Sequence, residues 1–277
     1  MIIVFIIEII KAVLIGIIQG ITEWLPISST GHMILADEFI KLDVSAAFME
    51  MFLVVVQLGS ILAVCVLYFK RLNPFAPQKT AEEKRASWLL WLKVAIACVP
   101  AAVIGILFDD TINELFYNHN TVVNMLLLYG AAFIIVENLN KNRKPTIDSV
   151  DKITYKAALA VGAFQVLSLI PGTSRSGATI IGAIVIGLTR VAAAEFSFIL
   201  AIPVMFGASA LKMLKFGFAF TGYELTILIV GMLTAFVVSF AAIRFLLDFV
   251  KKNTFRAFGY YRIILGTIVL AYFTFRQ

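Results

Sequence analysis

The sequence predicts an all-α, polytopic membrane protein that forms a single membrane domain over residues 1–277. Hydrophobic residues make up 61% of the chain and charged residues 14%, and the mean hydropathy is +0.96. A soluble domain has about 45–50% apolar and about 25% charged residues, so the composition excludes a soluble enzyme and a nucleic-acid-binding module. The apolar runs are long and continuous, whereas β-barrel strands alternate apolar and polar residues over roughly ten positions. Membrane-spanning helices are therefore expected.

Six segments are apolar enough and nearly or fully long enough to cross a bilayer, which takes about 20 residues. They are residues 51–69, 88–108, 121–136, 196–211, 225–243 and 257–275. The last contains Arg262, whose long side chain we expect to reach the membrane surface. The sequence thus predicts about six transmembrane helices.

Two further apolar segments, 2–35 and 157–188, are interrupted near their middles. The first carries several polar residues and a proline, and the second is broken by residues 171–177. Each is too long for a loop and too broken for one span, so we expect two re-entrant helical hairpins. Irregular backbone at membrane depth is tolerated only where it is buried in protein or lines a cavity. A functional site is therefore expected at these breaks.

The two broken segments also resemble each other in sequence. A glycine, a glutamine and a closing glycine recur 146 residues later, and a proline is displaced by one. The matched pairs are Gly16 and Gly162, Gln19 and Gln165, Gly31 and Gly177, and Pro26 and Pro171. The chain thus divides into repeat one (about 1–137), a linker loop (138–156) and repeat two (about 157–277). Each repeat has one hairpin and three spans, so the second is inverted, which places a site at the repeat interface near mid-membrane.

The distribution of the +6 net charge predicts the orientation of the chain. Loops 70–85 and 138–156 each carry five Lys or Arg residues, whereas 109–120 carries none. Basic loops face the cytoplasm, so the termini and the mouth of the site are expected on the outer face of the membrane. Lys212 and Lys215 are exceptions on the predicted outer side.

The break in the first segment gathers residues that could carry chemistry. Gln19 and Glu23 are four apart and share one helix face. Hydroxyl groups follow on Ser28, Ser29 and Thr30, and His32 comes next. The hydroxyls could simply cap the following helix. Capping does not explain Glu23 and His32 together in an apolar chain, where ionisable residues at membrane depth are costly and indicate function.

The break in the second segment suggests a phosphate site. It contains Thr173, Ser174, Arg175 and Ser176. Amides at a helix start bind anions, and arginine can hold phosphate through two hydrogen bonds. Alternatively, Arg175 only pairs with Glu23 or reaches the membrane surface. If the two breaks meet, their residues suit phosphoryl transfer: arginine and amides for the phosphate, a hydroxyl or water as nucleophile, histidine as acid or base, and Glu23 for a divalent cation.

Two motifs resemble signatures of the undecaprenyl pyrophosphate phosphatases, also called bacitracin-resistance proteins. Residues 19–32 read QGITEWLPISSTGH and residues 171–177 read PGTSRSG. The resemblance extends over essentially the whole chain, including QLGS at 57–60 and EFSF at 195–198. It implies an inverted-repeat fold and an enzyme of the bacterial plasma membrane that hydrolyses undecaprenyl pyrophosphate to undecaprenyl phosphate and inorganic phosphate. That reaction recycles the lipid carrier of peptidoglycan synthesis.

The resemblance also implies a role for each site residue. Glu23, Ser29, His32 and Arg175 would be catalytic, with Ser29 as the proposed nucleophile. Phosphate binding would involve Ser28, Thr30, Thr173, Ser174 and Ser176. Glu23 would hold Mg²⁺ or Ca²⁺. The motif often has Glu at position 19, where this chain has Gln19. Gln19 could therefore be a second ligand through its amide oxygen, or it could only position Glu23.

Three points stay open on the sequence alone. A polyprenyl-phosphate transporter or flippase would also use broken helices in an inverted repeat. The nucleophile could be Ser29, His32 or water. The expected partners are the polyprenyl pyrophosphate and membrane lipids, with no nucleic acid, and a homodimer is left open.

Overall fold

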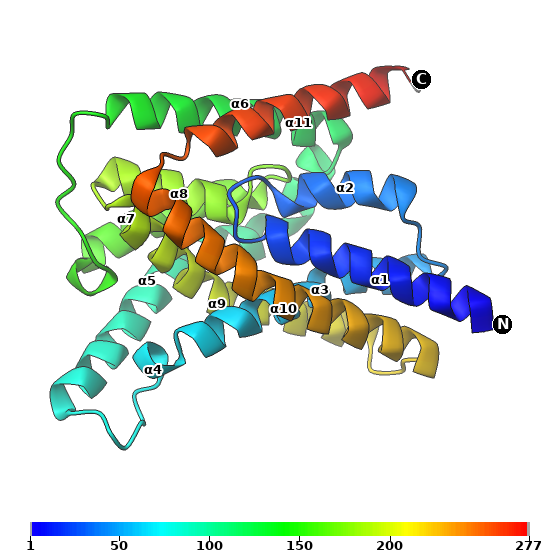
Figure 1. The fold of residues 1–277 in the computed structure, drawn as a ribbon, viewed down its shortest axis with the longest axis horizontal. Helices are drawn as coiled ribbons and strands as arrows, with labels where there is room; N and C mark the ends of the chain where they lie inside the picture. The colour runs from blue at the N-terminus through cyan, green and yellow to red at the C-terminus, as the bar shows by residue number, and fades with distance from the viewer. Residues whose placement is uncertain (1, 276–277) are drawn as a thin grey trace.

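The computed structural model describes residues 2–275, apart from the side chains at positions 2 and 109, and in this part of the chain the secondary structure is helical apart from one isolated β-bridge (Figure 1). The long helices are α1 (Ile2–Thr22), α3 (Ala46–Leu67), α5 (Ala81–Phe116), α6 (His119–Leu139), α9 (Arg190–Phe216), α10 (Gly222–Lys252) and α11 (Arg256–Phe275). The shorter elements are α2 (Ser29–Phe39), α4 (Phe69–Leu72), η1 (Val150–Lys152), α7 (Tyr155–Val166), η2 (Leu167–Leu169) and α8 (Arg175–Ile186).

Seven of the described helices are long and apolar enough to cross a membrane, one more than the sequence predicted. The additional one is α1, which runs unbroken for 21 residues, because its polar residues do not interrupt the helix before Thr22. The polytopic all-α class is confirmed, and five of the six predicted spans each lie within one described helix, most of which extend beyond the span, whereas 51–69 runs past the end of α3 to the first residue of α4. The extensions follow from capping residues that hydropathy overlooks.

Helix α5 illustrates this difference between hydropathy and capping. It begins at Ala81 rather than at residue 88, because the Thr80 hydroxyl accepts the Glu83 amide and the Glu83 carboxylate accepts the Thr80 amide. Such reciprocal bonds satisfy amides that a helix start leaves unpaired. The predicted end at residue 108 coincides with a kink, where Phe108 leaves helical geometry (φ −127°).

Two short turns interrupt the helices at the predicted breaks. The first turn (residues 23–28) joins α1 to α2, and the second turn (residues 170–174) joins η2 to α8. Beyond each short helix, the chain returns to where the segment began. The Glu8 carboxylate of α1 accepts the amide of Asp43, and the strand-like pairing of Ile147 with Leu188 joins the segment before α7 to the segment after α8.

The helices of the two halves pack against one another. Helix α1 lies along α10 and α7 lies along α5, while α3 packs on α9 and α6 on α11 (Figure 1). Glycines permit the close approaches: a Cβ at Gly16 would lie 2.7 Å from the carbonyl oxygen of Gly231, and one at Gly162 would collide with the backbone of Ala97. Small residues at such contacts favour helix association in membranes.

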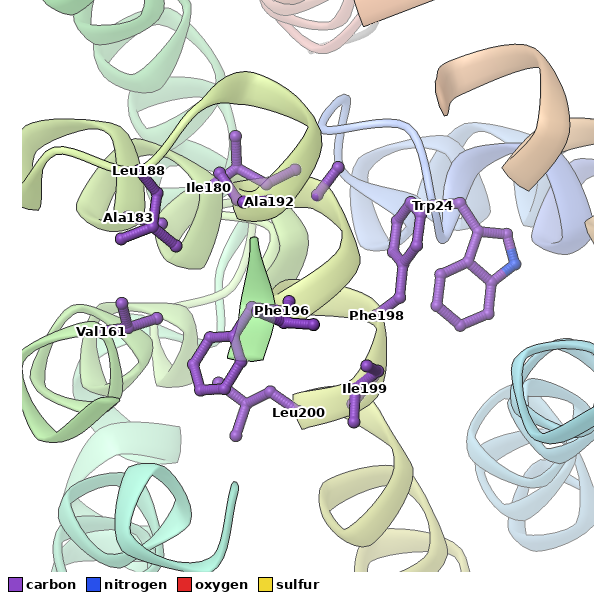
Figure 2. Packing of buried hydrophobic residues seen from close by; sticks show 14 of the residues in the cluster. Trp24, Val161, Ile180, Ala183, Leu188, Ala192, Phe196, Phe198, Ile199 and Leu200 are labelled. Carbon is purple, nitrogen blue, oxygen red and sulfur yellow. The ribbon is translucent and has the colours of Figure 1, made fainter. Parts of the chain in front are cut away.

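The largest buried cluster surrounds α8 and α9 and extends to the first turn. Trp24 is fully buried there and packs edge-to-face on Phe198 of α9, with ring centroids 5.2 Å apart (Figure 2). This aromatic contact fixes the first turn against α9, beside the residues that the sequence singled out.

Candidate active site

A single carboxylate, that of Glu23, lies at the centre of the candidate site. Its Oε1 accepts a hydrogen bond and ion pair from Arg175 Nη2 at 2.9 Å. Its Oε2 accepts from Gln19 Nε2 at 3.0 Å and from the Ser29 hydroxyl at 3.1 Å. Glu23 is 7% exposed, so the charge is separated from solvent and stabilised by these three donors. The structure thus brings together predicted residues from both breaks.

The first residue of α8, Arg175, completes the buried pair. Its side chain is only 11% exposed and does not reach the surface. Nη1 donates to the backbone carbonyl of Ser197 on α9 at 2.9 Å, and the guanidinium lies 5.7 Å from the Trp24 ring centroid. The planar guanidinium is therefore held on three sides, an arrangement suited to oriented phosphate binding.

A serine hydroxyl also joins the two turns directly. Ser176 Oγ donates to the backbone carbonyl of Glu23 at 3.1 Å, and it lies 3.2 Å from Ser174 Oγ. Because Ser176 is on α8 and Glu23 follows α1, these contacts place the starts of α2 and α8 at one site.

Each short helix begins after a serine with an unusual backbone conformation. Among the described residues, Ser28 and Ser174 are the two non-glycine residues with positive φ, both at 73°. The Ser28 side chain accepts the amide of Gly31, and the Ser174 side chain accepts the amide of Gly177. Strained backbone of this kind costs about 1–3 kcal/mol and is concentrated at functional sites. Helix starts also carry a partial positive charge, which attracts anions.

Arg262 corrects one expectation from the sequence. Its residue is 0% exposed, so it does not reach the membrane surface. Nη2 donates to the carbonyls of Gly172 (2.8 Å) and Met125 (3.1 Å), and Nη1 donates to that of Pro26 (3.4 Å). The guanidinium of α11 therefore ties the first turn, the second turn and α6 together, because buried carbonyls need donors that the broken helices do not supply.

Three other predicted residues lie outside the Glu23 network. The two ring nitrogens of His32 contact the Ser28 carbonyl and the Tyr261 hydroxyl, each at 2.7 Å. Thr30 is exposed, and Thr173 is fully buried with an unpaired hydroxyl oxygen. The hydroxyl of Ser29 is directed at Glu23, so the Ser29–His32 contact that one nucleophile hypothesis requires is not formed in this structure.

Glu23 and Gln19 place a carboxylate and an amide side by side that could supply oxygen ligands to a divalent cation. The Gln19 Oε1 atom is buried and has no hydrogen-bond partner, although its amide nitrogen is bonded to Glu23. Within the described part of the chain, no cluster of three His, Cys, Asp or Glu residues could hold a metal. One carboxylate and one amide oxygen fit Mg²⁺ when substrate phosphates supply further ligands.

Several residues at the site were not identified from the sequence as functional. They are Trp24 and Ser197, which hold Arg175, and Tyr261 and Arg262, which contact His32 and the turns. Arg262 lies six positions inside α11, where a charged side chain could have been read as internal. Trp24 and Ser197 lie within motifs noted in the sequence, and Tyr261 has no such signal, but the roles of all three depend on which helices pack together.

Comparisons with known proteins agree with this arrangement. The family described as bacitracin resistance protein BacA matches residues 12–268. An undecaprenyl-diphosphatase of Desulfitobacterium hafniense is 59% identical over 98% of this chain and 98% of its own. An undecaprenyl-diphosphatase of Enterococcus faecalis is 62% identical over 96% of this chain and 97% of its own length. An undecaprenyl-diphosphatase of Acetivibrio thermocellus is 61% identical over 96% of this chain and 98% of its own length. The chain belongs to the BacA family of bacitracin resistance proteins.

Proposed function

We propose that this chain is a membrane undecaprenyl-diphosphatase, which hydrolyses undecaprenyl diphosphate to undecaprenyl phosphate and inorganic phosphate. The reaction would recycle the lipid carrier of cell-wall synthesis and so confer bacitracin resistance, as the name of the family indicates. The observation that carries the proposal is the meeting of Glu23, Ser29 and Arg175 between the starts of α2 and α8.

We infer a role for each group in the first step, and the hydrogen bonds of the site support it. Arg175 and the first amides of the two short helices bind the terminal phosphate. The Ser29 hydroxyl already donates to Glu23, which can accept its proton as Ser29 Oγ attacks phosphorus. The bond from phosphorus to the bridging oxygen breaks, and undecaprenyl phosphate leaves with the bonding electrons.

Water then completes the reaction by attacking the phosphoserine, releasing inorganic phosphate and restoring the hydroxyl. His32 is three residues after Ser29 on α2, a spacing that places both on one face of the helix, and we assign it the acid–base role toward this water. The remaining predicted phosphate-binding hydroxyls, those of Ser28, Thr30, Thr173, Ser174 and Ser176, surround the same helix starts.

A divalent cation, Mg²⁺ or Ca²⁺, would be held by Glu23 and Gln19 Oε1 and would neutralise charge on the diphosphate oxygens. The unpaired, buried Gln19 Oε1 supports this assignment, because an acceptor without a donor is costly unless another ligand uses it.

The membrane arrangement that we propose has two re-entrant hairpins, α1–α2 and α7–α8, in an inverted repeat. The return of each hairpin toward its own beginning supports it, as does the equal geometry of Ser28 and Ser174. The packing of each hairpin on a helix of the other half is further support: α1 of the first half packs on α10 of the second, and α7 of the second half packs on α5 of the first. With the basic loops inside, the site opens toward the outer face, where the diphosphate is expected.

The test is release of phosphate from undecaprenyl diphosphate by purified protein in detergent micelles. Glu23→Gln and Arg175→Gln should each lower kcat/KM by at least about 100-fold, whereas Asp248→Asn, at an exposed ion pair remote from the site, should retain wild-type activity. Unchanged turnover in both site variants would refute the site. Movement of labelled lipid across proteoliposomes without phosphate release would favour the transporter hypothesis instead.

A further inference from the structure

A tyrosine of α11 holds the second ring nitrogen of His32. The Tyr261 hydroxyl lies 2.7 Å from His32 Nε2, and the two rings are nearly parallel, with an interplanar angle of 4°. On the other side of the ring, Nδ1 lies 2.7 Å from the backbone carbonyl of Ser28. The imidazole is therefore held from both ends by groups of different hydrogen-bonding character.

These contacts determine which nitrogen of the neutral ring carries the proton. A carbonyl oxygen can only accept, so Nδ1 must be the donor toward Ser28. Neutral imidazole has one N–H group, and Nε2 therefore carries the lone pair, which accepts the phenolic hydrogen of Tyr261. Nδ1 is committed to the backbone, so proton transfer occurs at Nε2: the phenolic hydrogen turns away, and the Nε2–H group that forms donates to the Tyr261 oxygen.

The contact of Tyr261 with His32 is not a consequence of dense packing. Tyr261 is 42% exposed, and its neighbour on α11, Tyr260, is 55% exposed with no contact to His32 found in the described structure. A single hydroxyl group thus distinguishes Tyr261 from a side chain that merely covers the surface of the helix.

We propose that Tyr261 is the positioning residue of His32. Its hydroxyl fixes the orientation of the imidazole, whose Nδ1–H tautomer the Ser28 carbonyl sets, so that Nε2 is presented as the proton acceptor. This inference rests on the acid–base role that the proposed function gives His32. Tyr261 itself need not touch the diphosphate.

The closing experiment compares Tyr261→Phe, which removes one oxygen atom, with Tyr260→Phe as the matched control. The chain has two histidines, His32 and His119, so ¹⁵N-histidine labelling in a His119→Gln background leaves one imidazole to observe. The Nε2 resonance of His32 should be the same in the parent and in Tyr260→Phe, whereas it should shift downfield in Tyr261→Phe, because the lone pair of Nε2 has lost its hydrogen bond there. The kcat for undecaprenyl diphosphate should fall about tenfold in Tyr261→Phe with KM unchanged, the loss expected for one hydrogen bond that aligns a reacting group.

An unchanged kcat or an unchanged Nε2 resonance in Tyr261→Phe overturns the inference. A separate variant, His32→Gln, distinguishes this failure from failure of the proposed function. Wild-type turnover in His32→Gln would remove the acid–base role of His32 and the inference with it, while the chemistry of Glu23 and Arg175 would still stand. Absence of phosphate release by the wild-type protein would instead refute the proposed function itself.

Discussion

The buried pair of Glu23 and Arg175 should show strong energetic coupling in unfolding experiments. The side chains are 7% and 11% exposed, and Oε1 and Nη2 are 2.9 Å apart. Replacing either residue with alanine leaves the other charge without its partner in a site that water hardly reaches. Removal of one member of a buried pair costs about 3–5 kcal/mol, because the remaining charge has lost its solvation and its counter-ion.

The double variant, Glu23→Ala with Arg175→Ala, removes both charges and therefore avoids the uncompensated one. The two single losses sum to roughly 6–10 kcal/mol. We expect the double variant to lose at least about 2 kcal/mol less than this sum, a coupling well above the roughly 0.5 kcal/mol within which independent sites add. The contacts that Arg175 keeps with Ser197 and Trp24 are too weak to replace a carboxylate.

The measurement is the free energy of unfolding of purified protein in detergent micelles, followed by circular dichroism over a denaturant series. The matched control is the pair formed by Asp248 and Lys251, whose side chains are mostly exposed although their charged atoms are 2.8 Å apart. That pair should show little or no coupling, because water screens it. Additive losses for Glu23 and Arg175 would refute the buried pair and the geometry derived from it.

Three further outcomes follow from the site. Arg262→Lys keeps the charge but cannot reach the carbonyls of three segments, so kcat should fall at least about tenfold; full activity would show that the turns need no such tie. Ser29→Ala should lower kcat by roughly 10²–10⁴-fold and abolish phosphate labelling of the protein by a ³²P-diphosphate substrate, whereas persistent turnover would assign the attack to water. Gln19→Glu adds a second carboxylate, so the cation concentration that gives half-maximal turnover after chelator treatment should decrease; an unchanged value would remove Gln19 from the cation site.

Much of the fold could be predicted because a membrane restricts what the chain can do. Spans such as 121–136 were found within α6 (His119–Leu139), since an apolar run of that length has few alternatives in lipid. The N-terminal segment was harder to interpret. Glu8 and Lys11 suggested an interruption, yet they form an ion pair on one helix face, which lets α1 continue to Thr22.

The candidate site was partly predictable for a different reason. Glu23 and Arg175 were conspicuous because charges are rare in apolar segments, and their separation by 152 residues in sequence was bridged by the similarity of the two breaks. The roles of Tyr261 and Arg262 could not be inferred, because they depend on α11 packing beside both turns. A residue that contacts the site from another helix leaves no spacing signal in its own segment.

The charges of the candidate site favour a diphosphate over its product. Glu23 and Arg175 neutralise each other, but Arg262 binds three carbonyl oxygens, and no carboxylate partner for it is found in the described part of the chain. Two helix starts add partial positive charge at the same place. The substrate-free site therefore has excess positive charge in surroundings of low dielectric constant, where each added negative charge is bound more strongly than in water. A diphosphate carries more negative charge than a monophosphate, so this excess favours retention of the substrate and allows undecaprenyl phosphate to leave.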